Sequence, residues 1–320
     1  MFRIAFLTAV FFATSALSDP LPSWRATEAK TRIIAFVDSV TDPESTGYVT
    51  PSARIAVFDN DGTLWAEQPV YFQLVYALDR LREKAEADPS ILTSDALKAG
   101  AEGDIEGILA SGVDGLKEVL AVSHSGMSVQ EFQSDVRAWI ATATHPETGK
   151  LYRAMVYQPM LELLAYLRAE GFQTWIVSGG GLHFLRTFAQ ETYGIPPQQV
   201  LGSATPTEYD ANARDIMKLP GIAFIADKAG KAVGIDSRIG RRPIFAAGNS
   251  DGDFQMIEYT MAGNGPRFGL IVHHTDAERE FAYDRDSHVG RLARGLDEAP
   301  DRGWLIVDMA RDWARIWSDE

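Results

Sequence analysis

RIAVFDNDGT, residues 54–63, is the stretch of sequence that decides the fold. Its apolar residues follow one another without alternation, as in a strand that is buried on both faces of a sheet. The run ends at Asp59 and Asp61, and Gly62 beside them permits a tight turn. The segment therefore predicts a buried strand that presents two carboxylates at its carboxyl end.

Two further apolar runs end in polar clusters in the same way. TWIV at 174–177 is followed by SGGG at 178–181, and PIFAA at 243–247 is followed by GNSDGD at 248–253. Each is short and continuous and is followed by a polar cluster that contains glycine, which is typical of a buried strand. Three predicted strands thus end in residues that carry or position polar groups.

Helices are predicted between and after these runs. The apolar spacing favours a helix at 160–167 and another is expected at 182–193, while 268–272 and 305–307 read as further strands. Residues 200–235, rich in Gly, Pro and Thr, are expected to form short strands or a hairpin. Alternating strands and helices predict a doubly wound, Rossmann-like parallel sheet, an α/β fold. Because the carboxyl ends of parallel strands lie on one edge, where such folds bind ligands, we expect the three polar clusters to share one crevice.

The segment between the first and second runs has a helical pattern instead. Apolar residues from Val70 to Leu81 lie on one face of a predicted helix, and SVQE at 128–131 has the spacing of a capping box. No strand pattern interrupts it, so we expect an inserted α-helical cap above the crevice. The predicted domains are the cap at 66–157 and an α/β catalytic core at 19–65 and 158–320.

The first eighteen residues have the order of a secretory signal peptide. Arg3 carries the only charge before an apolar run from Ile4 to Leu17, and small residues precede Asp19. The run is shorter than the about 20 residues that a membrane-spanning helix needs. We expect cleavage after Ser18 and a periplasmic or secreted protein with no membrane anchor, since no cysteine follows that could carry a lipid.

Composition excludes several classes of protein. The 320 residues are 46% hydrophobic and 23% charged, as in globular proteins rather than disordered or coiled-coil ones. The formal charge of −14 repels phosphate backbones and anionic lipid, so nucleic acid and membrane surfaces are poor partners. The absence of cysteine excludes disulfides, thiolate nucleophiles and cysteine-bound metals. Nothing in the sequence indicates an oligomeric state.

The acidic pair suits phosphoryl transfer. Of two carboxylates in one small volume, one can attack phosphorus while the other transfers a proton. Asp59, Asp61 and Asp253, with a phosphoryl group and one lysine, leave about four negative charges, which one Mg²⁺ ion halves. Oxygen ligands without His or Cys suit Mg²⁺ better than zinc. The predicted cofactor is therefore Mg²⁺.

VFDNDGTL at 57–64 resembles the first motif of the haloacid dehalogenase superfamily of phosphohydrolases. Within that superfamily the chain resembles phosphoserine-phosphatase-like members with an inserted helical cap. Ser178 resembles the second motif and GNSDGD at 248–253 the fourth. The third motif is a lone lysine, for which Lys231 has the most similar setting and Lys228 is the alternative.

The resemblance implies a role for each matching residue. Asp59 would attack phosphorus and form an aspartyl-phosphate, and Asp61 would serve as general acid and then as general base. The phosphoryl oxygens would be bound by Thr63, Ser178, Gly179 and Lys231. Magnesium would be held by Asp59, the backbone carbonyl of Asp61, Asn249 and, directly or through water, Asp253.

Asn249 departs from the pattern of the family, because many members have an aspartate there. An amide oxygen still ligates Mg²⁺ but adds no charge, so we expect a weaker affinity for the metal. Asp251 is the next candidate if Asn249 is not a ligand.

Four other functions stay open. A dehalogenase also uses an aspartate nucleophile, but those enzymes usually have a hydrophobic residue at the position of Asp61, which argues against that function. A phosphonate-cleaving enzyme needs a lysine from the cap, and no motif singles out Lys84, Lys98 or Lys117. A phosphotransferase would replace water by an alcohol, and a catalytically silent binding module would keep the crevice without turnover.

The predicted substrate is a small phosphomonoester whose identity the cap would decide. Trp65, Tyr71 and Tyr76 are interpreted first as cap packing, although they could face a quaternary amine such as phosphocholine. His273 and His274 follow the predicted strand at 268–272. They are interpreted first as structural or surface residues, although they could reach the rim of the crevice.

Overall fold

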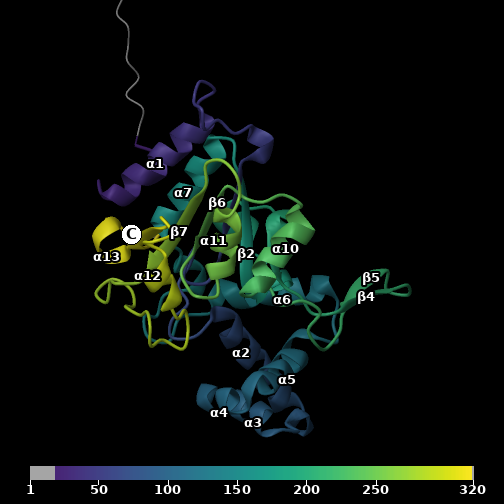
Figure 1. Cartoon of the computed structure of the whole chain (residues 1–320). Helices are drawn as coiled ribbons and strands as arrows, with labels where there is room; N and C mark the ends of the chain where they lie inside the picture. Colours follow the sequence, from purple (N-terminus) through teal and green to yellow (C-terminus); the bar gives the residue numbers. More distant parts are fainter. Residues whose placement is uncertain (1–18, 319–320) are drawn as a thin grey trace, which may run out of the picture.

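Six parallel strands form the central sheet of the computed structural model, which describes residues 19–318 (Figure 1). The strand order is β3-β2-β1-β6-β7-β8, and every neighbouring pair is parallel. The chain thus builds outward from β1 in both directions, and the predicted doubly wound α/β fold is confirmed. The strands are β1 (Ile55–Phe58), β2 (Gln173–Gly181), β3 (Val200–Ser203), β6 (Phe245–Gly248), β7 (Phe268–His273) and β8 (Leu305–Asp308).

Thirteen α-helices are present among the described residues. They are α1 (Glu28–Thr41), α2 (Phe72–Ala87), α3 (Asp95–Glu102), α4 (Ile105–Ala110), α5 (Gly112–His124), α6 (Val129–Thr142), α7 (Gln158–Ala169), α8 (Leu182–Leu185), α9 (Ala189–Tyr193), α10 (Ala229–Ile239), α11 (Phe254–Met261), α12 (Arg294–Glu298) and α13 (Met309–Asp312). Single 3-10 turns lie at Pro51–Ala53, Pro89–Ile91, Tyr152–Ala154 and Pro197–Gln199.

Helices cover both faces of the sheet. On one face α1 and α7 pack in the same hydrophobic cluster as Ala56 and Phe58 of β1. On the other face α10 and α11 pack with Ile55 and Val57. Successive side chains of a strand point to opposite faces, so a strand covered on both sides must be apolar at every position. This is why the sequence of β1 does not alternate.

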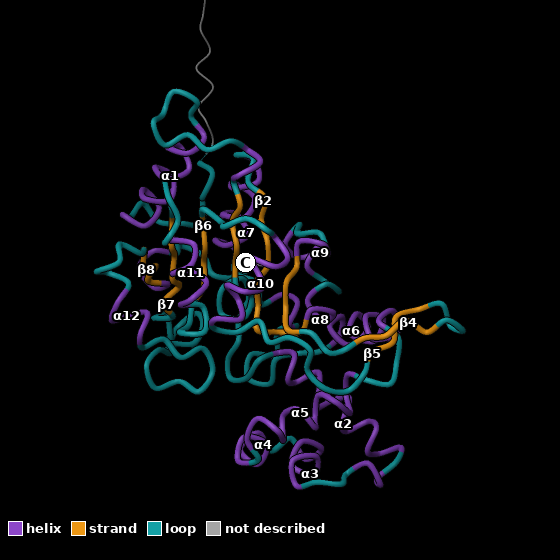
Figure 2. Tube along the Cα trace, turned by 45° about the vertical axis from the view of Figure 1, so that its right-hand side comes forward, coloured by secondary structure: helices purple, strands orange, loops and turns teal. Residues whose placement is uncertain are grey.

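Helices α2 to α6 lie between β1 and β2, and residues 66–157, all of which are described, contain no strand. In Figures 1 and 2, α3, α4 and α5 lie apart from the layers of the sheet. With the outer part of α2 they share a small core of their own: Ala77, Leu78, Leu81, Leu97, Ile108 and Val119. The inner part of α2 and the buried face of α6 belong to the main core instead: Phe72, Tyr76, Phe132, Val136, Trp139 and Ile140. The boundary between the two cores therefore crosses α2. The predicted capping box at the start of α6 is confirmed.

Two local predictions are wrong. The single helix expected at 182–193 is two short helices, because the Thr187 hydroxyl donates to the carbonyl of His183 at 2.9 Å and the backbone turns there. Residues 200–235 do contain β3 and a hairpin of β4 (Thr207–Asp210) and β5 (Asp215–Lys218), but 229–239 is a helix, α10. The buried face of α10 includes Lys231 and Gly234 besides Ile235, so its apolar stripe is interrupted.

No helix within residues 19–318 is both long and apolar enough to span a bilayer. The predicted signal peptide, residues 1–18, lies outside the described residues.

Candidate active site

The turn after β1 brings the acidic pair together with two other polar side chains. The carbonyl oxygen of Asn60 accepts the N–H of Leu64 at 2.8 Å, which closes the turn. Gly62 has a φ of 70°, and a Cβ there would lie 2.1 Å from Asn249 Nδ2 and 2.3 Å from Glu67 Oε1. Only glycine fits this backbone and this space. Asn249 and Glu67 are therefore packed directly against the turn.

Lys231 lies between two carboxylates. Its Nζ is 2.7 Å from Asp59 Oδ1 and 2.5 Å from Asp253 Oδ1, and the lysine is only 2% exposed. Lys231 lies in the first turn of α10, whereas Lys228, the alternative, is exposed at the N-terminus of that helix. The geometry selects Lys231.

The loop after β6 is organised by its own aspartates. Asp253 Oδ2 accepts the N–H groups of Asn249 and Ser250, each at 3.0 Å. Since Oδ1 contacts Lys231, both oxygens of Asp253 are engaged within the protein. Asp251 accepts the N–H groups of residues 293–295 at the start of α12. The alternative ligand predicted at 251 thus holds a helix terminus instead.

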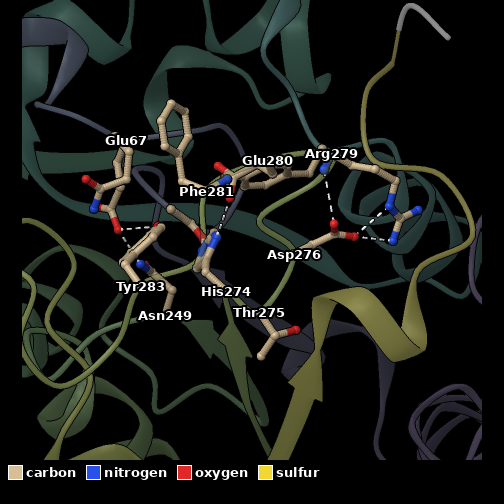
Figure 3. A network of polar contacts seen from close by, with 12 residues as sticks. Glu67, Asn249, His274, Thr275, Asp276, Arg279, Glu280, Phe281 and Tyr283 are labelled. Atoms are coloured by element: carbon tan, nitrogen blue, oxygen red, sulfur yellow. Dashed lines mark hydrogen bonds and ion pairs between the residues drawn. The ribbon is translucent and has the colours of Figure 1, made fainter. Parts of the chain in front are cut away.

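Asn249 lies between a hydroxyl and a carboxylate. Its Oδ1 accepts a hydrogen bond from Thr63 Oγ1 at 3.0 Å. Its Nδ2 donates to Glu67 Oε1 at 2.6 Å, and both residues are labelled in Figure 3. The Tyr283 hydroxyl donates to the same oxygen of Glu67 at 2.8 Å. Thr63 is fully buried and lies behind Asn249, not on the cavity described below. The sequence singled out neither Glu67 nor Tyr283.

His274 supports the turn from behind. Its Nε2 donates to the carbonyl oxygen of Gly62 at 2.7 Å, and its Nδ1 lies 3.1 Å from Glu280 Oε2. The ring is buried, so the structural interpretation holds for His274. His273 contacts Asp284 at 3.3 Å. Neither histidine lines the cavity.

Burial raises the pKa values of the acidic groups at the site. For Asp59, burial has the largest effect, the charge of Asp253 adds to it, and Lys231 opposes it. Burial likewise raises the pKa of Asp61, and it raises the pKa of Glu67 well above the usual range. Burial, which penalises the charged form, is the largest cause of all three shifts.

The residues at this position fit Mg²⁺. Oxygen donors are provided by Asp59, the backbone carbonyl of Asp61 and the amide of Asn249, which are the hard ligands that Mg²⁺ prefers. Among residues 19–318, no three Asp, Glu, His or Cys side chains converge as ligands, so carboxylates alone do not complete a site. A backbone carbonyl and an amide oxygen would have to supply the remaining ligands, and the negative charge of the acidic side chains favours a divalent cation.

A cavity of about 510 Å³ opens at the carboxyl edge of the sheet. Asp59, Asp61, Glu67 and Lys231 line one end of it. Further walls come from the loop after β6, from the glycines after Ser178, and from α2, α5 and α6 of the helical insert. The three polar clusters therefore meet at one cavity, as the sequence predicted.

The second cluster meets the acidic turn through its backbone. Ser178 is fully buried, and its Oγ accepts the N–H of Gly180 at 3.0 Å. A Cβ on Gly180 would lie 3.5 Å from Asp61 Oδ2, so the two segments touch. Gly179 lines the cavity, whereas Ser178 does not. The Ser178 hydroxyl therefore lies beneath the cavity wall, next to Asp61.

The aromatic residues near the turn pack rather than form a cage. Trp65 is buried and its Nε1 donates to Asp61 Oδ1 at 2.7 Å, and Tyr76 is fully buried with its hydroxyl on Asp135. Tyr71 alone of the three lines the cavity and is 40% exposed. Trp65 and Tyr76 therefore pack within the protein, as first interpreted, and the three rings do not form a cage for a quaternary amine.

The helical insert presents no lysine to the cavity. Lys84 Nζ donates to the carbonyl of Val122 at 2.6 Å. Lys98 and Lys117 are paired with acidic residues one turn away on exposed helix faces. None of the three candidates for a phosphonate-cleaving Schiff base is in place.

The fold and the site together define an α/β protein with an acidic turn, a buried lysine and an aspartate-bearing loop at the carboxyl edge of a parallel sheet. The family model of the haloacid dehalogenase-like hydrolases matches residues 56–258. The chain therefore belongs to the haloacid dehalogenase-like hydrolase family. No curated protein matches the chain.

Several solved structures are similar in fold. A conserved, functionally unknown protein from Anaerococcus prevotii DSM 20548 is 16% identical, with 81% of this chain and 89% of that chain covered and a TM-score of 0.56. A protein of unknown function from Bordetella pertussis Tohama I is 17% identical, with 80% and 98% covered and a TM-score of 0.49. A phosphoserine phosphohydrolase-like protein from Francisella tularensis subsp. tularensis SCHU S4 is 19% identical, with 78% and 98% covered and a TM-score of 0.40.

Proposed function

We propose that the protein is a Mg²⁺-dependent phosphatase that hydrolyses a small phosphomonoester. The observation that carries this proposal is the position of Lys231 Nζ, 2.7 Å from Asp59 Oδ1 and at the same end of the cavity as Asp61. A carboxylate, a proton-transferring neighbour and a buried cation are the groups that covalent phosphoryl transfer needs.

In the first step, a carboxylate oxygen of Asp59 attacks phosphorus. The bond from phosphorus to the ester oxygen breaks, and Asp61 gives its proton to the departing alkoxide. Burial raises the pKa of Asp61, which favours the protonated form that this step requires. The hydrogen bond from Trp65 Nε1 to Asp61 Oδ1 fixes the orientation of that carboxyl group.

In the second step, water attacks the aspartyl-phosphate. Asp61 accepts a proton from the water, the bond from phosphorus to Asp59 breaks, and inorganic phosphate leaves. Lys231 neutralises the charge shared by Asp59 and the phosphoryl oxygens, while Asp253 holds the ammonium in place. The backbone around Gly179 lines the cavity and is available to the phosphoryl oxygens.

Mg²⁺ would be held by Asp59, the carbonyl of Asp61 and Asn249. When bound, it supplies positive charge to the phosphoryl group. Asp253 would contribute to the metal site only indirectly, because its oxygens are engaged by Lys231 and by its own loop. Thr63 and Glu67 orient the Asn249 amide.

The decisive experiment is phosphate release from a panel of phosphomonoesters by the purified protein, with Mg²⁺ and with excess chelator. We expect release that depends on the metal and that stops in Asp59→Asn. Turnover without any divalent cation would contradict the metal requirement. Turnover that survives Asp59→Asn would contradict the covalent mechanism.

Asn249→Asp should tighten Mg²⁺ binding and weaken the metal-free protein. The new carboxylate adds a charged ligand, but it also faces Glu67 Oε1, which Asn249 Nδ2 approaches at 2.6 Å. A lost buried hydrogen bond of this kind costs about 1–3 kcal/mol. Calorimetric Mg²⁺ titration and thermal unfolding with and without Mg²⁺ measure the two effects. Unchanged Mg²⁺ affinity would remove Asn249 from the ligand set.

We also propose that the chain is exported and cleaved after Ser18, and that it acts without a membrane anchor. The order of charge, apolar run and small residues in 1–18 supports this. Expressed in full in a Gram-negative host, the protein should be recovered from the periplasm or the medium. Its mass should be that of a chain whose first residue is Asp19. A cytoplasmic product that retains residues 1–18 would contradict export.

A further inference from the structure

A second buried lysine lies at the cavity, away from the acidic turn. Lys218 ends β5, is 3% exposed and lines the cavity. Its Nζ lies 3.0 Å from Thr205 Oγ1, 3.3 Å from His183 Nδ1 and 4.4 Å from the centroid of the Phe132 ring. All of these partners are neutral groups or a ring.

Lys218 differs from Lys231 in that no carboxylate of the described residues contacts it. Lys231 contacts two carboxylates, whereas Lys218 contacts none among residues 19–318. Its ammonium has three N–H donors, and only Thr205 and His183 accept from it in this part of the chain. Burial lowers the pKa of Lys218 to about 8, so the charged form still predominates at neutral pH. A buried ammonium without an anion is costly to keep, and it is retained where an anion is to be bound.

The neighbouring histidines do not add positive charge. Burial, reinforced by the charge of Lys218, lowers the pKa of His183 to about 4. The same two causes lower the pKa of His124 to about 3. Both imidazoles are therefore neutral at physiological pH. This end of the cavity carries one positive charge, which matches one singly charged anion.

Much of the remaining lining of the cavity is apolar. Both the main body and the helical insert contribute to it: Leu74, Leu116, Leu120, Leu182, Ile222 and Ile225. Such a wall favours a hydrocarbon or aromatic spacer. The lining of the cavity thus contains the acidic groups with Lys231, a second ammonium, that of Lys218, without a paired acid, and a large apolar surface.

We propose that the substrate is a phosphomonoester with an apolar spacer and a carboxylate remote from the phosphoryl group, and that Lys218 binds this carboxylate. The proposal rests on the phosphatase function proposed above and specifies its substrate class. One ammonium neutralises one carboxylate but only half of a second phosphate dianion, which is why a carboxylate is assigned. Lys218 is then a residue that determines specificity and takes no part in the chemical steps.

The test compares matched esters. The esters are 4-phosphonooxybenzoate, 3-(4-phosphonooxyphenyl)propanoate and the primary amide of each, with 1,4-phenylene bisphosphate for a second phosphate. Each amide has the shape of its acid without the charge. In wild-type protein at about 0.15 M salt, we expect kcat/KM for at least one acid to exceed that of its amide by tenfold or more. The negative charge of the whole protein would give the opposite order.

Lys218→Met should reduce the acid-to-amide ratio to within twofold, and Lys218→Arg should retain part of it. Lys84→Met is the matched control, because it removes the same charge from a half-buried lysine that does not line the cavity. The ratio should stay at the wild-type value there. Circular dichroism and the thermal midpoint establish that each variant folds. The acid-to-amide ratio of the wild-type protein tests the proposal even if a variant does not fold.

The outcomes separate the two proposals. Hydrolysis of acids and amides at equal rates would overturn the carboxylate assignment and leave the phosphatase function intact. A ratio that survives Lys218→Met, or a Lys218-dependent preference for the bisphosphate over both acids, would also overturn it. If the wild type hydrolyses other phosphomonoesters of the panel but none of these five esters, the substrate class is wrong and the phosphatase function stands. If it hydrolyses no ester at all, the proposed function fails, and calorimetric binding of each acid and its amide decides the role of Lys218.

Discussion

Asp59→Asn should abolish phosphomonoesterase turnover, with kcat lowered by about 10⁴-fold or more. Loss of a covalent nucleophile has effects of this size, because the other catalytic groups act through it. The protein should remain folded, since Lys231 keeps its contact with Asp253 at 2.5 Å and one buried carboxylate is replaced by a neutral amide. Initial rates of phosphate release and thermal unfolding measure the two outcomes.

Asp251→Asn is the matched control for this variant. Asp251 lies in the loop at the same edge of the sheet, but its carboxylate accepts N–H groups at the start of α12. An amide oxygen can still accept there, so kcat should stay within severalfold of the wild type. An equal loss in both variants would point to a general effect of acidic charge and away from a nucleophile at Asp59.

Lys231→Met should lower both stability and activity. Removal of the ammonium leaves Asp59 and Asp253 buried without a cation, and breaking a buried pair in this way costs about 3–5 kcal/mol of unfolding free energy. The activity loss should be about 10²–10³-fold, as for other groups that stabilise charge in a transition state. Chemical denaturation and kcat measure the two effects separately.

Two comparisons make this prediction specific. Lys228→Met removes the same charge from an exposed position three residues away and should change neither quantity appreciably. Adding Asp253→Asn to Lys231→Met should restore part of the stability without restoring activity, because one stranded carboxylate is removed. If Lys228→Met is the damaging variant, the assignment of the active-site lysine is wrong.

The central strands β1, β6 and β7 were predictable because they are buried on both faces. A strand in that position must be apolar at nearly every residue, so each leaves a continuous pattern in the sequence. Strands β2 and β8 were predicted from shorter apolar runs, since some of their residues are partly exposed. The acidic turn was equally predictable from the sequence. Gly62, which has a positive φ, stands beside two aspartates, and packing alone rarely requires that combination.

Glu67, Tyr283 and Lys218 could not be predicted in the same way. Glu67 follows the first motif closely, but a single glutamate has no periodicity that separates it from a surface residue. Tyr283 and Lys218 come from segments distant in sequence, and only folding brings Tyr283 to Glu67 and Lys218 to the cavity. Helix α10 was not predicted for a related reason. Its buried face carries a lysine that is held by carboxylates and not by apolar contacts.

The sequence by itself determined the parallel sheet, the acidic turn at its edge and the residues that could act on phosphorus. These depend on local rules, because strand burial, turn geometry and residue chemistry are each expressed within a few consecutive positions. Only the tertiary structure decided which lysine faces Asp59, what Asn249 contacts, and which walls enclose the cavity. Those features depend on distances between segments up to about two hundred residues apart, and such distances exist only once the helices have packed on the sheet.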